Sequence, residues 1–248
     1  MGKKILQADG TYCYTENCRV HSRQLTYTQS VLSEQLTRID KDNKVIFIAG
    51  KPVPTISFKE LYHVGTLNPA NKKAESYEGQ GFSVSVNPNE WRRIARLSGD
   101  INKLTKTDNH FINYHDLTKE QFDNVNQWGL DKGYIQEVTS YTVSWWDDEW
   151  DAEMNMSFVS LEEASDEAEN YDTNPVSVLG YAATSSFPDS TVKEGALGVE
   201  EILFTVWASE NTDYDGVWWD DMLDVGRLSA PRGVILNREL QGWNITPE

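Results

Sequence analysis

The segments 60–66, ELYHVGT, and 81–91, GFSVSVNPNEW, decide the fold class of this sequence. The first segment opens with a short, largely apolar stretch that predicts a strand over residues 60–64. In the second, Phe, Ser, Val, Ser and Val alternate, which predicts a strand over residues 82–86 with both serines on one face. We therefore expect two strands close together in the chain, the second with a polar face.

A helix start follows the second strand directly. Asn87 suits the N-cap, Pro88 the first helical position and Glu90 the third, which is a capping-box pattern. The same pattern recurs further along the chain, where Thr118 is followed three residues later by Gln121. Both positions predict helices, each continued by apolar residues.

The remaining elements are indicated by apolar runs and turn residues. Gly129 is expected to end the second helix. Residues 134–146 and 150–160 resemble a β-hairpin around an acidic turn. Residues 45–49 and 201–208 are short, strongly apolar runs, and both predict buried strands.

These elements together predict an α+β fold with a mainly antiparallel sheet and a few flanking helices. Residues 1–40 contain turn formers and charges with little periodicity, and we expect them to form an N-terminal arm. Residues 41–248 are expected to form a single α+β domain, since no linker long enough to divide them is present.

The charge of the chain restricts its partners. The 248 residues include 22 Lys and Arg against 39 Asp and Glu, a formal net charge of −17. Such a field repels a phosphate backbone, so nucleic acid is unlikely as a main partner. No apolar run approaches the roughly 20 residues of a membrane-spanning helix, and the first residues lack the apolar core of a signal peptide. We expect a cytoplasmic protein without a membrane partner.

Three soft or borderline metal ligands lie close together in CYTENCRVH. They are Cys13, Cys18 and His21. This cluster could bind zinc, although a fourth protein ligand would have to come from elsewhere. The alternative, two thiols and a histidine in a flexible arm, is left open.

The end of the first strand is the strongest candidate for a binding site. Tyr62, His63 and Gly65 fall where a strand ends, so that a side chain can reach a cleft and a glycine lets a ligand approach the backbone. A histidine with a purely structural role is the alternative.

The pairing of LYHVGT with GFSVSVNP resembles the opening half of the ADP-ribosyltransferase-like fold. This resemblance implies an NAD-dependent ADP-ribosyltransferase or NAD glycohydrolase-like enzyme, with NAD as substrate and an unknown acceptor. It implies that His63 contacts a ribose of NAD and that a glutamate, Glu201 with Glu200 as competitor, stabilises the oxocarbenium-like centre. The residues that would line the NAD pocket are Tyr62, Gly65, Thr66, Ser83 and Ser85. In this chain Val64 separates His63 from Gly65, which are adjacent in the family motif.

Other features leave alternatives open. Trp218 and Trp219 form either a stacking wall for a planar ring or part of the core. Arg232 meets either a substrate phosphate or one of the many carboxylates. The acidic residues from Asp147 to Glu169 are either a solvated face or the binding surface of a non-enzymatic acidic protein that blocks a basic macromolecular surface.

Overall fold

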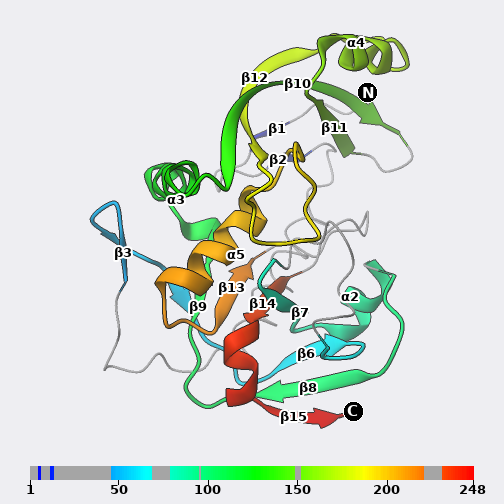
Figure 1. Cartoon of the computed structure of the whole chain (residues 1–248). Coiled ribbons are helices and arrows are strands. Elements are labelled where there is room, and N and C mark those ends of the chain that lie inside the picture. Colours follow the sequence, from blue (N-terminus) through cyan, green and yellow to red (C-terminus); the bar gives the residue numbers. More distant parts are fainter. Residues whose placement is uncertain are drawn as a thin grey trace.

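The computed structural model describes residues 5–6, 12–13, 46–68, 79–94, 96–148, 152–220 and 231–248. In these residues the chain is an α+β fold with mostly antiparallel sheets and few helices, as predicted (Figure 1). The predicted arm, residues 1–40, lies outside the described residues except for the two-stranded pair β1 (Ile5–Leu6) and β2 (Tyr12–Cys13).

A five-stranded sheet forms the centre of the fold. Its strands, in spatial order, are β5 (Thr55–Ile56), β9 (Phe111–Asn113), β13 (Gly216–Trp219), β14 (Arg232–Leu236) and β7 (Gly81–Val84). All neighbouring pairs are antiparallel except β9 and β13. The alternating segment 82–86 forms most of β7, and Ser85 continues it as a bridge residue.

The two faces of this sheet bury different cores. Trp219 packs in one cluster with Phe204, whereas Trp218 packs on the opposite face with Phe58 and Leu104. Both tryptophans are fully buried, so the interpretation of these residues as core is confirmed. Consecutive residues of a strand point to opposite faces, which explains why neighbouring tryptophans serve different cores.

A second, three-stranded sheet covers the Trp218 face. Its order is β15 (Asn244–Pro247), β8 (Ile101–Thr105) and β6 (Leu61–Val64), all antiparallel. β6 is the strand predicted over residues 60–64. Backbone hydrogen bonds between Tyr62 and Ser85, 2.9 Å in both directions, join β6 to β7 and so connect the two sheets.

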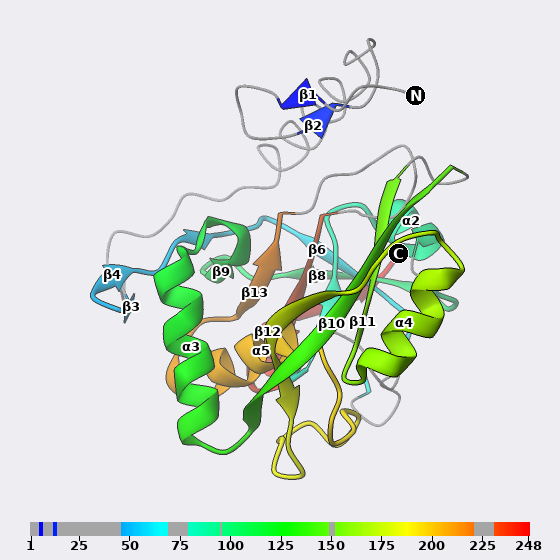
Figure 2. The same cartoon turned by 90° about the horizontal axis from the view of Figure 1, so that it is seen from above.

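The other face is covered by helices. α3 (Lys119–Asp131) and α5 (Glu200–Asn211) pack against each other on this side (Figure 2). α3 begins with the predicted capping box, in which Thr118 accepts from the Gln121 N–H and the Gln121 side chain accepts from the Thr118 N–H. Local sequence therefore determines where this helix starts.

The prediction that residues 201–208 form a strand is wrong, because they lie within α5. Residues 202–208 are all buried and, except for Thr205, apolar, so this part of the helix shows neither helical nor strand periodicity. A short apolar run of this kind cannot be assigned by periodicity alone. The acidic residues Glu200 and Glu201 occupy its first turn, where they complement the positive end of the helix dipole.

The prediction that Gly129 ends α3 is also wrong. The helix continues to Asp131, and Gly133, with φ of 70°, follows its end. Gly129 is needed inside the helix because a Cβ atom there would lie 2.7 Å from Leu203 Cδ2. The earlier helix, α2 (Pro88–Ile94), starts as predicted, with the Glu90 N–H donating to Asn87 Oδ1 at 3.3 Å.

A third sheet, of order β11, β10, β12, extends from the body (Figure 1). The predicted hairpin is confirmed as β10 (Ile135–Asp147) and β11 (Ala152–Phe158), and β12 (Val176–Ala183) pairs with the other side of β10. α4 (Leu161–Glu169) packs on one face of this sheet through Ala164 and Ala168 against Val143.

Short elements complete the fold. The strand predicted over residues 45–49 shortens to β3 (Phe47–Ile48), which pairs with β4 (Lys51–Pro52). Ile48 is buried, as expected, but Phe47 is exposed. Two 3-10 helices, η2 (Tyr114–Asp116) and η3 (Asn237–Gly242), follow β9 and β14. In the described part of the chain, no helix has the length and apolar character needed to span a membrane.

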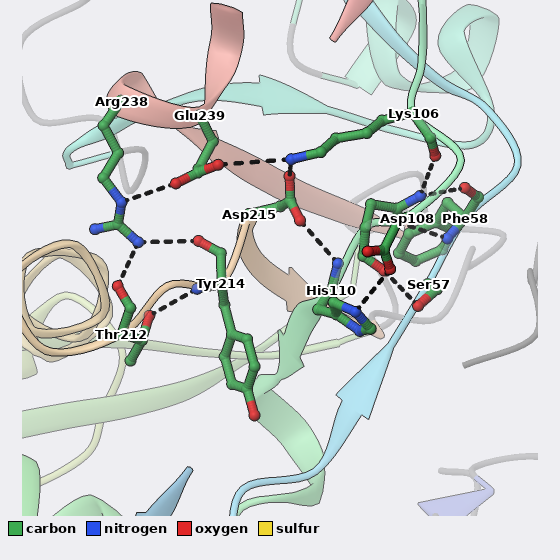
Figure 3. A network of polar contacts seen from close by, with 11 residues as sticks. Ser57, Phe58, Lys106, Asp108, His110, Thr212, Tyr214, Asp215, Arg238 and Glu239 are labelled. Carbon is green, nitrogen blue, oxygen red and sulfur yellow. Dashed lines mark hydrogen bonds and ion pairs between the residues drawn. The ribbon is translucent and has the colours of Figure 1, made fainter. Parts of the chain in front are cut away.

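A polar network ties the C-terminal end of α5 to the neighbouring strands (Figure 3). Arg238 donates to the carbonyl oxygens of Ala208, Ser209 and Thr212, at the end of the helix. The Arg238 guanidinium also donates to Glu239, whose carboxylate lies 3.6 Å from the Lys106 ammonium. This arrangement holds the end of α5 in place, and so supports the position of its first turn.

Candidate functional site

A pocket of about 430 Å³ opens between η2, α3 and the first turns of α5. Its volume falls in the range of small-molecule sites, roughly 300–1,000 Å³. The residues that line it are Tyr114, His115, Phe122, Val125, Asn126, Glu200 and Phe204. Each of the three elements thus contributes at least one aromatic and one polar side chain to the pocket.

Aromatic rings form the wall of the pocket. The Tyr114 ring lies 4.8 Å from the Phe122 ring and 5.2 Å from the Phe204 ring, both edge to face. It also lies 5.5 Å from the Trp219 ring of β13. Because three neighbours hold Tyr114 in position, the pocket offers a rigid aromatic surface suited to a flat ring.

Two adjacent carboxylates stand at the start of α5. Burial raises the pKa of the Glu200 carboxyl above its ordinary value, and the charge of Glu201 adds to this effect. Burial also raises the pKa of Tyr114, and the negative charges of Glu201 and Glu200 raise it further. The Tyr114 hydroxyl therefore stays protonated and can act as a hydrogen-bond donor.

Glu201 is held by a cation. Its carboxylate lies 3.3 Å from the Arg232 guanidinium, and this guanidinium lies 4.8 Å from the centre of the Trp219 ring. Arg232 is largely buried at the start of β14 and is oriented by both partners. Of the two alternatives for Arg232, the structure shows the carboxylate contact.

The predicted serines lie on the α5 side of the central sheet. Ser83 is directly opposite Val234 in the β7–β14 register, and Val234 belongs to the same core cluster as Phe204. Ser85 lies two residues further along the same face, and its hydroxyl donates to the Pro231 carbonyl at 2.7 Å. Both serines are buried. The face that holds Glu201 and Arg232 therefore also holds the two predicted serines.

His63 lies on the opposite face. Leu61, two residues earlier in β6, packs in the Trp218 cluster, and the His63 ring meets the Phe82 ring edge to face. Its Nδ1 lies 2.7 Å from the Ser83 carbonyl oxygen and donates to it, since a carbonyl oxygen can only accept. The central sheet separates His63 from Glu201, and the structure does not bring these two predicted catalytic residues together.

The other residues predicted to bind the cofactor surround the end of β6. Tyr62 is buried and donates its hydroxyl to Glu60 at 2.6 Å. Gly65 has φ of 113°, a conformation that favours glycine, and its carbonyl accepts from Asn102. Thr66 is exposed. Gly65 and Thr66 follow the end of β6, whereas Tyr62 lies within it, and none of the three lines the pocket beside α5.

The predicted metal cluster cannot be placed. Cys18 and His21 lie outside the described residues, and only the backbone of Cys13 is described, within β2. Elsewhere, in the residues that the structure does describe, no group of three or more His, Cys, Asp or Glu is arranged to hold a metal ion. Zinc binding by Cys13, Cys18 and His21 stays a prediction.

Sequence reasoning missed most of the pocket. Tyr114, His115 and Asn126 carry no recognised motif, and Glu200 was considered only as the competitor of Glu201. A weak signal exists, because Tyr114 and His115 directly follow a buried strand and precede a well-capped helix, where side chains often reach a binding site.

Comparison of the chain with family models, with curated proteins and with solved structures found no match. The geometry of the pocket and the chemistry of its side chains therefore indicate the function.

Proposed function

We propose that this chain is an NAD-consuming enzyme, an ADP-ribosyltransferase or NAD glycohydrolase, whose site is the pocket beside α5. The observation that carries the proposal is the rigid aromatic pocket with Glu200 in its wall and Glu201, held by Arg232, next to it. The ADP-ribosyltransferase-like fold is part of the same proposal.

The pocket suits the nicotinamide end of NAD. The flat, positively charged nicotinamide ring would lie against Tyr114 and Phe204, stacked on the face of one ring and meeting the edge of the other. The Asn126 side chain offers both a donor and an acceptor, which is what the carboxamide of nicotinamide requires. Glu200 adds a negative charge favourable to a cationic ring.

The carboxylates fit the reaction. When the bond between the ribose C1′ and the nicotinamide nitrogen breaks, its electron pair leaves with nicotinamide and positive charge develops at C1′. A carboxylate already oriented by a cation, as Glu201 is by Arg232, stabilises that charge without reorganising. This is the role that the family resemblance predicts for Glu201.

Glu200 supplies the second function. An oxygen or nitrogen atom of the acceptor, or the oxygen of water, forms the new bond to C1′. This nucleophile then releases a proton. A carboxylate whose pKa is raised by burial is a better proton acceptor than an ordinary glutamate. The proposal therefore assigns Glu200 as the general base, and it leaves His63, behind the central sheet, without a catalytic role.

The test is release of nicotinamide from NAD, measured by chromatography with the purified chain and with added cell extract as a source of acceptor. Glu201→Gln should lower the rate by about 10²–10³, which is typical for removal of one stabilising group at a charged transition state. Glu210→Gln, at the other end of α5, is the matched control and should leave the rate unchanged.

Two further results decide the assignment. Calorimetric titration of the unmodified chain with NAD should show binding that weakens in Tyr114→Ala. Failure of the folded, unmodified chain to bind NAD would overturn the proposal. A rate that falls in His63→Ala but not in Glu201→Gln would instead move the site to the other face of the sheet.

A further inference from the structure

The outer strand β12 of the third sheet has one unpaired edge. On one side β12 pairs with β10 along its whole length. On the other side, among the described residues, only its end is bonded, through Ala182 bridging Leu197 and Ala183 bonding Ala196 and Gly195. From Val176 to Tyr181 the outward backbone groups are therefore available to another strand.

Three of the exposed side chains of this edge are large and aliphatic, and the fourth is Ser177. Val176 is 61% exposed, Val178 43% and Leu179 67%. Natural proteins usually protect such an edge with lysine, with an inward charge or with a covering loop, and the strand VSVLGYAA has no charged residue. An uncharged, aliphatic, unpaired edge is a template for strand addition.

The stretch of sequence that contains this strand is strongly acidic. Between Gly133 and Val192 the sequence contains no Lys, Arg or His, while Asp and Glu recur throughout. α4, which packs on β10 and β11, reads LEEASDEAE. Lys119 of α3 acts on the Tyr181 end of β12, but the carboxylates of Asp123 and Glu137 act on the same residue. The acidic residues therefore favour a positively charged strand over a negatively charged one.

We infer that the free edge of β12 binds a basic, extended polypeptide segment of another protein, which adds to the third sheet as a fourth strand. The backbone of the segment pairs with Val176–Tyr181, its apolar side chains lie beside Val176 and Val178, and its Lys or Arg side chains are attracted by carboxylates near the strand, such as those of Glu137 and Asp123. This inference specifies the partner and the place of contact for an acidic binding surface, and it holds whether or not NAD is consumed at α5.

The test uses a fluorescent peptide of alternating Lys and Val, eight residues long, and measures its binding by anisotropy at low and high salt. We expect binding that weakens as salt increases, because exposed charges are screened. A peptide of the same sequence with alternate backbone nitrogens methylated keeps its charge but cannot pair as a strand. It should bind at least about tenfold more weakly.

A substitution in the chain gives an independent result. Leu179→Lys places a positive charge on the free edge and should also weaken binding at least about tenfold. Phe47→Lys is the matched control, since Phe47 is 61% exposed on the distant β3–β4 hairpin. This variant should bind the peptide as tightly as the unmodified chain does. Equal binding of the methylated and unmethylated peptides, or of Leu179→Lys and the unmodified chain, would overturn the inference.

Discussion

The Lys106 ammonium lies 2.7 Å from Oδ1 of Asp215, whose side chain is 5% exposed (Figure 3). Oδ2 of the same carboxylate accepts the backbone N–H of His110 at 2.9 Å. Burial raises the pKa of Asp215, and the hydrogen bonds from Lys106 and His110 oppose that shift. A charge this deeply buried depends on its partners, and Lys106 is the one that a substitution can remove.

Lys106→Met should destabilise the fold by about 3–5 kcal/mol at neutral pH, since it leaves a buried carboxylate without its cation. Denaturant unfolding measures the loss. The double variant with Asp215→Asn should recover much of it, because the uncompensated charge is then removed. Lys119→Met is the control, as Lys119 pairs with Asp123 in solvent, and its midpoint should not move. Equal midpoints for Lys106→Met and Lys119→Met would contradict this account.

The helix cap at Thr118 gives a second prediction. Thr118→Ala removes the acceptor for the Gln121 N–H and should cost about 1 kcal/mol. Thr118→Ser keeps the hydroxyl and should stay close to the unmodified chain. The midpoint of thermal unfolding is the measurement, and a loss as large in the serine variant as in the alanine variant would show that the methyl group, and not the cap, matters.

The caps were predictable because they depend on a few neighbouring residues. Thr118 with Gln121, and Asn87 with Glu90, specify a hydrogen bond within four positions of the chain, so the sequence contains the whole interaction. The β10–β11 hairpin was predictable for a similar reason, since its two strands lie close together in the sequence.

The nature of α5 and the position of the site were not predictable in this way. Residues 202–208 are buried on every side because the sheet and α3 enclose them, and this enclosure is a property of the tertiary structure. Tyr114 and Glu200 are distant in sequence and meet only because α3 and α5 pack over the same face. The register between β6 and β7, which places His63 and Ser83 on opposite faces, likewise becomes visible only when the strands pair.

Gly216 gives a third prediction, based on close packing. A Cβ atom at this position of β13 would overlap the Val234 carbonyl oxygen and the ring of Phe111. Gly216→Ala should therefore cost at least about 1–3 kcal/mol through overpacking of a buried strand. Gly133→Ala is the comparison, since φ there is 70° but nothing lies within 4 Å, and backbone strain alone should cost about 1 kcal/mol. A milder effect at Gly216 than at Gly133 would contradict the packing argument.

The pocket itself predicts a dependence of stability on pH. Because burial raises the pKa of Glu200 in the folded state, the folded chain binds a proton more readily than the unfolded chain. The contribution of Glu200 to stability is then fully present below the unfolded pKa, and it is lost as the pH rises through the folded pKa. Glu200→Gln cannot ionise, so its stability relative to the unmodified chain should increase from acid to neutral pH.

Unfolding free energies at several pH values, from the acid range to neutrality, measure this difference. Val125→Ala is the control, because it alters the same pocket without a titratable group, and its cost should be the same at every pH. If the difference for Glu200→Gln decreases as the pH rises, the Glu200 carboxylate is stabilised in the folded state and the pKa is lowered. Glu200 would then be a poorer proton acceptor than an ordinary glutamate, and the general-base role in NAD cleavage would have to pass to another group.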